Sequence, residues 1–160
     1  MKEIALANGK GVALIDDEDY ELVSRYRWYL CKDLRTSYAL TWRWSPKRRI
    51  SVRMHRLLMD APAGMDVDHV DHDGLNNRRA NLRLCTRAQN LANSRKGSGT
   101  SSRFKGVCWY KPSSKWMAKG SLNRKTIYLG YFDSEVEAAK AYNAFAIEHY
   151  GEHALLNEVE

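Results

Sequence analysis

The chain has 160 residues, a net charge of +7, and a composition that is 44% hydrophobic and 28% charged, as is ordinary for a soluble protein of one or two small domains. It has no apolar run of the ~18 residues that a membrane span needs and no signal-peptide pattern, so we expect a cytoplasmic protein with no membrane partner. The cysteines Cys31, Cys85 and Cys108 form no Cys-x-x-Cys pair, which argues against a cysteine-ligated zinc and predicts buried free thiols.

Two acid-free basic stretches carry much of the positive charge. One lies between Asp33 and Asp60 and the other between Arg87 and Asp133, and both interleave Trp and Tyr with the cations. A solvated basic surface would explain the charge alone, but the aromatic residues favour DNA or RNA as the partner. The cations of the first stretch are Arg35, Arg43, Lys47, Arg48, Arg49, Arg53 and Arg56.

The first sixty residues predict a β-rich scaffold. Apolar runs at residues 4–6 and 12–15 flank Asn8-Gly9-Lys10-Gly11, which predicts a β-hairpin. Residues 16–26 begin with acids that suit the positive end of a short helix. Strands are expected at residues 28–30, 38–44 and 49–53, and a brief helix at residues 55–59.

Residues 68–90 are the most informative run. Asp68 and His69 end a predicted strand, a loop rich in Asp, Asn and Gly follows at residues 71–77, and residues 82–84 return as a second strand. Thr86 is expected to cap a helix that runs to about residue 94, and Asn90 on its first turns can face back towards Asp68. These residue types can hold a hard metal ion beside a histidine base.

The last third of the chain predicts a separate module. Residues 97–102 read Gly-Ser-Gly-Thr-Ser-Ser, which predicts a flexible linker within residues 95–102. Strand-like runs at residues 105–110, 115–122 and 125–132 precede a helix that begins at the Ser134/Glu137 capping box and ends at Gly151. We therefore expect an α+β chain with domains at residues 1–94 and 103–160, the second a three-stranded antiparallel sheet with a helix on one face and a basic free face.

The run at residues 68–90 resembles the HNH nuclease motif, the ββα-metal finger, in its phage and intron homing-endonuclease variant. The resemblance covers about residues 65–94 and rests on Asp68-His69, Asn81-Leu82-Arg83 and Asn90 with their separations. It implies that Asp68 and Asn90 bind one metal ion per active site, that His69 is the general base and that Asn81 braces the loop. Because both ligands are oxygens, Mg²⁺ or Mn²⁺ is favoured over Zn²⁺, and no small-molecule cofactor is expected.

Residues 103–158 resemble the Apetala-2/ethylene-response-factor domain. The resemblance rests on Phe104-Lys105-Gly106-Val107, Lys115-Trp116-Met117-Ala118 and Tyr128-Leu129-Gly130-Tyr131-Phe132. It implies a sheet that lies in the major groove of DNA. Cys108 and Tyr110 stand where the plant pattern has arginines, so we expect the module to anchor mainly on phosphates and not to read the plant target sequence.

Together these features predict a metal-dependent HNH homing endonuclease that cuts double-stranded DNA, nicking it as a monomer, with a dimer as the alternative for cutting both strands. A phage or mobile-element origin, which rests on the resemblance, would place it in a bacterial host cell. The alternatives are a DNA-binding regulator with a relic nuclease motif and an RNA-binding protein, although A-form RNA hides its major groove.

The roles of some residues stay open. His72 is either a ligand or a loop residue, Arg56 either a phosphate contact or a surface base, and the role of His55 is undetermined. The side chains that we expect to contact DNA are Arg53, Arg56, Arg83, Arg87, Lys105, Tyr110, Lys115, Lys119, Arg124, Lys125 and Tyr128.

Overall fold

The computed structural model describes residues 1–9, 11–33 and 36–159, and its internal contacts divide the chain into two compact units, Met1–Thr86 and Arg87–Glu160. Both units combine helices with small antiparallel sheets, which confirms the α+β class. The division precedes the helix that the sequence assigns to the N-terminal domain, so residues 87–94 belong to the second unit. Lys10 of the predicted hairpin turn and Arg35 of the first basic stretch lie outside the described residues. In the described part of the chain, no helix is long and apolar enough to cross a membrane.

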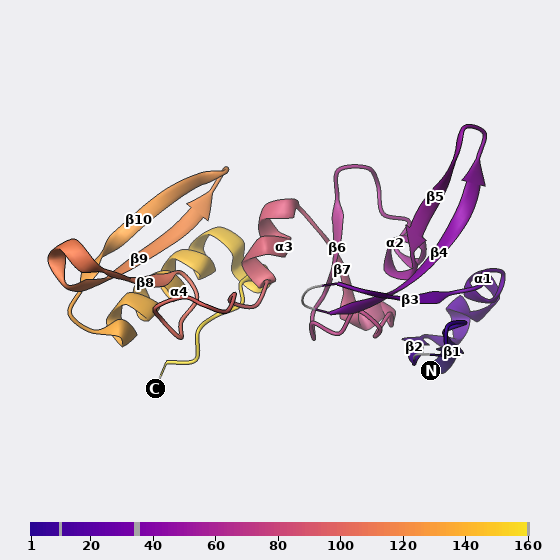
Figure 1. The fold of residues 1–160 in the computed structure, drawn as a ribbon, viewed down its shortest axis with the longest axis horizontal. Helices are drawn as coiled ribbons and strands as arrows, with labels where there is room; N and C mark the ends of the chain where they lie inside the picture. Colours follow the sequence, from indigo (N-terminus) through magenta and orange to yellow (C-terminus); the bar gives the residue numbers. More distant parts are fainter. Residues whose placement is uncertain (10, 34–35, 160) are drawn as a thin grey trace. The chain divides into compact units, whose positions relative to one another are not determined.

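The first unit contains three small antiparallel sheets (Figure 1). β1 (Lys2–Ala5) pairs with β2 (Val12–Ile15), which confirms the predicted hairpin. β3 (Tyr29–Lys32), β4 (Ser37–Ser45) and β5 (Arg48–Arg53) form the second sheet in that order, and β6 (Asp66–His69) pairs with β7 (Leu82–Cys85). The helical elements are η1 (Asp17–Asp19), α1 (Tyr20–Ser24), α2 (Met54–Leu58) and η2 (Arg79–Asn81).

The β4–β5 hairpin extends beyond β3 as a two-stranded ribbon. β3 pairs with β4 only from Ser37 to Leu40, whereas β4 and β5 stay paired out to Ser45 and Arg48. The ribbon therefore projects from its unit, as Figure 1 shows.

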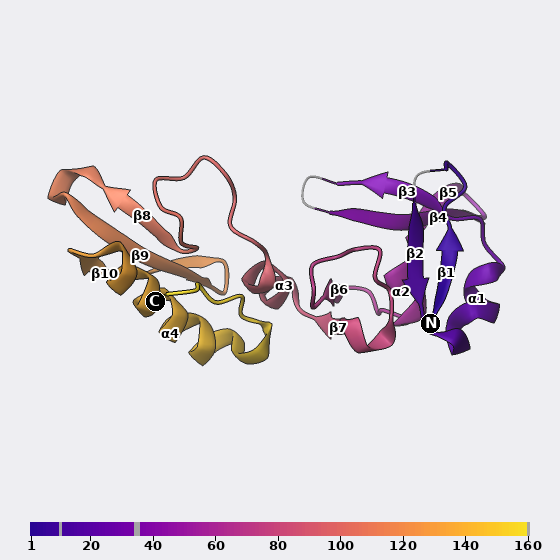
Figure 2. The ribbon, with the colours of Figure 1, turned by 90° about the horizontal axis from the view of Figure 1, so that it is seen from below.

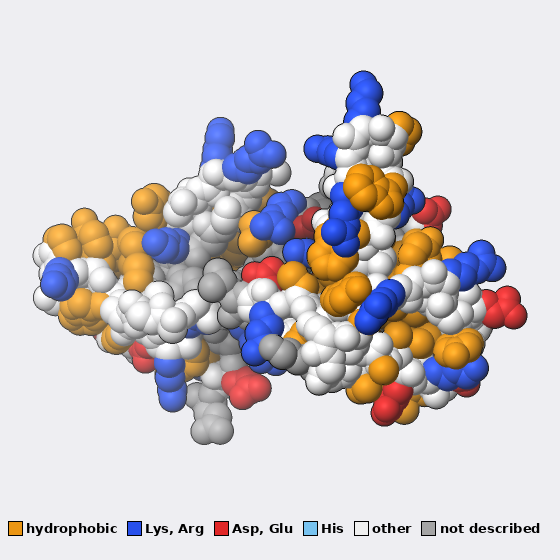
Figure 3. All heavy atoms as spheres, turned by 45° about the vertical axis from the view of Figure 1, so that its right-hand side comes forward, with side chains coloured by type: hydrophobic (Ala, Val, Ile, Leu, Met, Phe, Trp, Pro, Cys, Tyr) orange, Lys and Arg blue, Asp and Glu red, His pale blue; other side chains and the backbone are white. Residues whose placement is uncertain are grey.

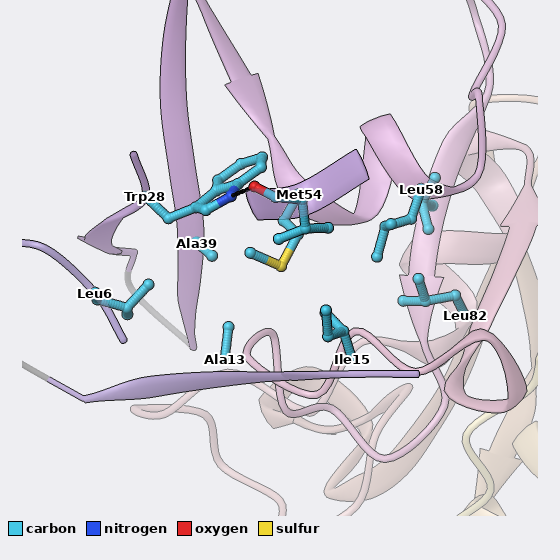
Figure 4. Packing of buried hydrophobic residues seen from close by; sticks show 10 residues of the cluster. Leu6, Ala13, Ile15, Trp28, Ala39, Met54, Leu58 and Leu82 are labelled. Atoms are coloured by element: carbon cyan, nitrogen blue, oxygen red, sulfur yellow. Dashed lines mark hydrogen bonds between the residues drawn. The ribbon is translucent and has the colours of Figure 1, made fainter. Parts of the chain in front are cut away.

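One buried cluster holds the first unit together. Trp28 and Met54 lie opposite Ala13 and Ile15 of β2 (Figure 4), and all four are almost completely buried. The indole nitrogen of Trp28 donates to the Val23 carbonyl at 2.9 Å, so this large side chain has its polar group satisfied. The cluster also includes Val67 of β6 and Leu82 of β7, and it thereby fixes the two strands that carry the predicted motif.

The second unit matches the predicted module closely. β8 (Val107–Tyr110), β9 (Lys115–Leu122) and β10 (Lys125–Phe132) form an antiparallel sheet with β9 in the middle. α4 (Glu135–Tyr150) covers one face of it (Figure 2). The Ser134 side chain caps α4 by accepting from the Val136 amide at 3.2 Å. The remaining elements are α3 (Arg87–Asn93), η3 (Lys111–Ser113) and η4 (Gly151–His153).

Small residues bring α4 close to the sheet. A Cβ atom at Gly120 would lie 2.1 Å from the Phe145 ring, and one at Gly106 would lie 1.9 Å from the Tyr142 ring. Ala138 and Ala139 are fully buried at the same interface. The alanines of α4 therefore let the helix approach the sheet, because their side chains add little bulk.

The expectation of buried thiols holds for one cysteine of three. All three are free; Cys85 is buried, but Cys31 and Cys108 are only partly so. Both lie in strands of small sheets, where the outer face has no second layer to cover it. Burial raises the pKa of the Cys85 thiol to about 11, so this group stays protonated and unreactive near neutral pH.

Candidate active site

The predicted catalytic pair ends strand β6. Asp68 lies opposite Arg83 and His69 opposite Leu82 in the β6–β7 register. The Asp68 side chain is almost fully buried, and its Oδ2 accepts from Nη2 and Nε of Arg83 at 2.8 and 3.0 Å. Arg83 therefore offsets the desolvation cost of burying the Asp68 carboxylate.

His69 lies in a pocket of aromatic and amide groups. Its Nε2 is 3.4 Å from Oδ1 of Asn77, a residue with no exposed surface. The ring contacts His55 edge-on with centroids 4.9 Å apart, and it lies 5.9 Å from the Tyr38 ring. Burial lowers the pKa of His69 and outweighs the opposing effects of the Asn77 hydrogen bond and the nearby carboxylates. The ring is therefore neutral near pH 7 and able to accept a proton.

Asn81 ties together the loop between β6 and β7. Its Oδ1 accepts from the Asp71 amide at 3.0 Å, and its Nδ2 donates to Asp71 Oδ1 at 2.9 Å and to the Asn76 carbonyl at 2.8 Å. Asp71 in turn accepts from the Asp73 amide at 2.8 Å and from Asn76 Nδ2 at 2.6 Å. Burial would raise the pKa of Asp71, but these hydrogen bonds lower it overall, so the carboxylate stays charged. His72 takes a left-handed backbone in this loop, with φ of 65°.

The first unit holds this loop at both ends. A Cβ atom at Gly74 would lie 2.4 Å from the Ser37 carbonyl oxygen, so the loop crosses β4 where only glycine fits. The Asn77 amide donates to the Leu14 carbonyl of β2 at 2.8 Å. Arg79 pairs with the buried Asp19 carboxylate at 2.7 Å. Asn77 and Asp19 were not among the predicted site residues; for Asn77 the signal was its place beside Asn76 in the predicted loop.

His55 is a second buried histidine in this pocket, which the sequence left without a role. Its ring meets Tyr38 edge-on at 5.3 Å and His69 at 4.9 Å. Among the described residues, nothing hydrogen bonds to its buried Nδ1. Burial lowers the pKa of His55 to about 2, helped by any positive charge on His69 and by the charges of Arg53 and Arg56.

The expected metal ligands are spread over both units. Asp68 is in β6 of the first unit and Asn90 is in α3 of the second. The described residues contain no group of three or more His, Cys, Asp or Glu side chains suited to a metal ion. One carboxylate and one amide oxygen form a hard donor set that fits Mg²⁺ or Mn²⁺, ions that substrate phosphates and water commonly complete, and it does not fit a structural zinc.

The three arginines expected to contact DNA from the first unit all have partners within it. Arg56 donates from Nη1 to the Met65 carbonyl at 2.7 Å and from Nη2 to Ala61 and Pro62 at 3.1 and 3.2 Å, so it clamps the turn before β6. Arg83 pairs with Asp68. Arg53 is half-exposed, pairs with Asp33 at 3.8 Å and stacks 4.8 Å above the Tyr38 ring.

In the second unit, the expected contacts divide between the sheet and α3. Lys119 and Tyr128 face each other across β9 and β10 and are exposed, and Tyr110 lies 5.2 Å from Tyr131 on the same face. Arg124 and Lys125 are exposed at the β9–β10 turn, Lys115 pairs with Asp133 at 3.1 Å, and Arg87 is the first residue of α3. The ammonium group of Lys105 instead donates to the Leu91, Ala92 and Ser94 carbonyls at the C-terminal end of α3.

Comparison with known proteins finds one relative along nearly the whole chain and two along part of it. A family model described as HNH endonuclease matches residues 60–92. A protein of Acanthamoeba polyphaga mimivirus, named as an uncharacterized HNH endonuclease, is 34% identical over 159 residues, which is 97% of this chain and 80% of that protein. Two rice proteins, each named APETALA2-like protein 2, from Oryza sativa subspecies indica and japonica, are 48% identical over 59 residues, or 36% of this chain and 13% of theirs. No solved structure matches.

Proposed function

We propose that this chain, which belongs to the HNH endonuclease family, is a metal-dependent endonuclease of the homing type that nicks double-stranded DNA. The observation that carries the proposal is the neutral His69 ring beside the Asp68–Arg83 pair, on a loop that Asn81 holds in shape. Such a site supplies a general base, an oxygen ligand for a metal ion and a cation that can pair with a phosphate. All three groups lie on β6 and β7 and the loop between them.

His69 acts as the general base. When its Nε2–H donates to the amide oxygen of Asn77, Nδ1 carries the lone pair that takes a proton from the attacking water. Asn77 is thus a positioning residue, held by its own bonds to the Leu75 and Leu14 carbonyls. Burial keeps the ring neutral and ready to accept this proton at neutral pH.

Asp68 and Asn90 supply the protein ligands of one Mg²⁺ or Mn²⁺ ion, a pairing supported by their spacing within the matched segment at residues 60–92. When bound, the ion polarises the scissile phosphate and stabilises the leaving oxygen. Arg83, next to the Asp68 carboxylate, contacts a phosphate oxygen. Asn81 keeps the loop in a shape that holds His69 and Asp68 at the same phosphate.

The second unit anchors the enzyme on duplex DNA. Its sheet face carries Lys119, Tyr128 and Tyr110, and its β9–β10 turn carries Arg124 and Lys125. The match to the rice proteins covers 36% of this chain and 13% of theirs, so we propose phosphate anchoring without a shared target sequence.

A plasmid-nicking assay tests the proposal. Supercoiled DNA should become nicked in Mg²⁺ or Mn²⁺, and EDTA should stop the reaction. His69→Ala should cleave about 10²–10⁴-fold more slowly, because that is the typical contribution of a general base to the rate. This variant should still bind duplex DNA. His149→Ala, a histidine of α4, serves as the matched control and should cleave normally.

Two results would contradict the proposal. Undiminished nicking by purified His69→Ala would remove His69 from the chemistry. Duplex binding with no metal-dependent cleavage by the unmodified chain would identify a DNA-binding regulator with a relic motif.

A further inference from the structure

One face of the β3–β4–β5 sheet carries several aromatic and arginine side chains. Residues that alternate along a strand, or that lie opposite each other on paired strands, share a face. Trp44 lies opposite Arg49, Leu40 opposite Arg53 on β5, and Leu40 opposite Tyr29 on β3. Arg27 joins this set because its guanidinium group lies 5.8 Å from the Tyr29 ring centroid. We call the set the aromatic–arginine stripe; its members are Tyr29, Tyr38, Trp42, Trp44, Arg27, Arg49 and Arg53.

The rings and cations of the stripe contact each other in two groups. Arg49 lies 4.5 Å above the Trp42 ring, and Trp42 lies 5.2 Å from Tyr29. Arg53 lies 4.8 Å above Tyr38. The opposite face of β4 places Ala39 and Thr41 in buried positions, so only the stripe face is open along the whole strand.

The exposure of the stripe increases towards the hairpin turn. Trp42 is 39% exposed and Trp44 is 83% exposed, although tryptophan is among the most costly side chains to leave in water. Figure 3 shows basic and hydrophobic side chains alternating on the projecting hairpin. No acidic residue occurs between Asp33 and Asp60 to offset the charge of this ribbon.

The inner end of the stripe reaches the candidate active site. Tyr38 lies on the stripe face of β4, where Arg53 stacks over its ring. The same ring has its centroid 5.9 Å from that of His69. From Tyr38 to Trp44, a strand rising by 3.4 Å per residue covers about 20 Å. The stripe therefore runs from the proposed base to the tip of the ribbon within one unit.

We infer that the aromatic–arginine stripe is a second DNA-binding surface, along which duplex DNA runs outward from the cleaved phosphate. A two-stranded ribbon fits the major groove, arginines neutralise phosphates, and an exposed tryptophan contacts or wedges between bases. The positive charge of the ribbon favours a polyanionic partner. Its aromatic rings beside guanidinium groups favour nucleic acid over an acidic protein, because rings can contact bases while cations pair with phosphates. The inference rests on the proposed function, which supplies the cleaved phosphate.

The length of the stripe predicts a footprint. At 3.4 Å per base pair, about 20 Å corresponds to about six base pairs. Trp44 should therefore protect DNA about six base pairs to one side of the cleaved bond. This protection should be lost in Trp44→Ala and retained in Trp44→Tyr, which keeps a ring.

Binding of the full chain to a labelled duplex, measured by fluorescence anisotropy in EDTA so that no cleavage occurs, tests the inference. Trp44→Ala should weaken binding about tenfold, in the range seen for loss of a ring that contacts bases. Arg49→Ala should lower the slope of log affinity against log salt by about 0.9, the value for one phosphate contact. Both side chains are exposed, so neither variant should unfold the protein.

Two matched arginines serve as controls. Arg43 lies on the same ribbon but faces the other way, opposite Ile50, and Arg25 is an exposed arginine at the end of α1. Alanine at either position should change the affinity by less than about twofold. An equal loss of affinity in Arg43→Ala and Arg49→Ala would mean that only the overall positive charge matters, and it would overturn the inference that the stripe binds DNA.

The outcomes also separate the stripe from the nuclease. If the unmodified chain nicks plasmid in Mg²⁺ but Trp44→Ala and Arg49→Ala bind as it does, the stripe is wrong and the enzyme assignment stands. If the chain binds through the stripe but never cleaves, the enzyme assignment fails instead. Tighter binding of single-stranded DNA, RNA or an acidic peptide than of duplex DNA would overturn the inferred partner.

Discussion

At the scale of single residues, the two histidines in contact are the unusual feature of the first unit. Both have a lowered pKa, with burial as the main cause, and His55 reaches about 2. Each is therefore neutral when folded at a pH where the unfolded chain, with an ordinary histidine pKa of about 6.5, takes up a proton. Their burial makes the folded state lose stability as the pH falls below that value.

The first prediction is a pH dependence of unfolding. Below about pH 6.5, each such histidine lowers the free energy of unfolding by up to about 1.4 kcal/mol per pH unit. His55→Gln cannot be protonated, so its unfolding free energy should fall less steeply between pH 6.5 and 5 than that of the unmodified chain. Urea unfolding at several pH values measures the difference. An identical slope in the two proteins would mean that His55 is not held neutral in the fold.

At the scale of elements, the active-site loop depends on its crossing of β4. Gly74 has no room for a side chain, because a Cβ atom would lie 2.4 Å from the Ser37 carbonyl and 2.7 Å from the Tyr38 ring. Its amide also donates to the Thr36 hydroxyl at 3.0 Å. Tyr38 in turn contacts both histidines, so a displaced loop would disturb the proposed base.

The second prediction follows from this crossing. Gly74→Ala should destabilise the chain by about 1–3 kcal/mol, the usual cost of overpacking, and should slow cleavage more than it weakens DNA binding. Gly97→Ala is the matched control, because nothing lies within 4 Å of a Cβ atom there. Thermal unfolding and nicking rates compare the two. Normal stability and cleavage in Gly74→Ala would mean that the loop moves freely without consequence.

The elements themselves were largely predictable from the sequence. The strands of both units follow alternating or continuous apolar runs between turn residues, and β9 and β10 match the predicted ranges because nothing interrupts their pattern. The Ser134 cap was predictable because capping is local chemistry. The placement of Arg83 and Leu82 opposite Asp68 and His69 was predictable, because a short loop joins the two strands and pairs them.

Contacts between distant segments were not predictable. Nothing in the sequence near His55 or Tyr38 indicates that their rings meet His69, because the sheet and α2 bring them there. The contact of the Lys105 ammonium group with the carbonyls at the end of α3 was also not predictable, and its role as a DNA contact stays a prediction. The Ser-rich segment read as a linker, yet Ser102 is buried and accepts from the Phe104 amide at 2.9 Å. Serine hydroxyls can satisfy a local backbone as readily as they can solvate a linker.

At the scale of the whole molecule, the division between the units falls between the two proposed metal ligands in the sequence. α3 belongs to the second unit, where the Leu155 amide donates to the Ala92 carbonyl at 3.1 Å. The proposed ligands Asp68 and Asn90 thus lie on either side of the division at Thr86 and Arg87. Residues 97–102, in contrast, lie within the second unit. The two segments should therefore respond differently to a change in length.

The last prediction uses insertions of Gly-Ser in the full chain. An insertion between Thr86 and Arg87 changes the spacing from Asp68 to Asn90, so it should abolish Mg²⁺-dependent nicking while duplex binding remains. The same insertion between Ser98 and Gly99, where the backbone is exposed, leaves that spacing intact and should preserve nicking. Asn90→Ala should reproduce the first result without any change in length. If nicking survives both the first insertion and Asn90→Ala, Asn90 is not a metal ligand. Asp68 would then be the one proposed protein ligand that remains.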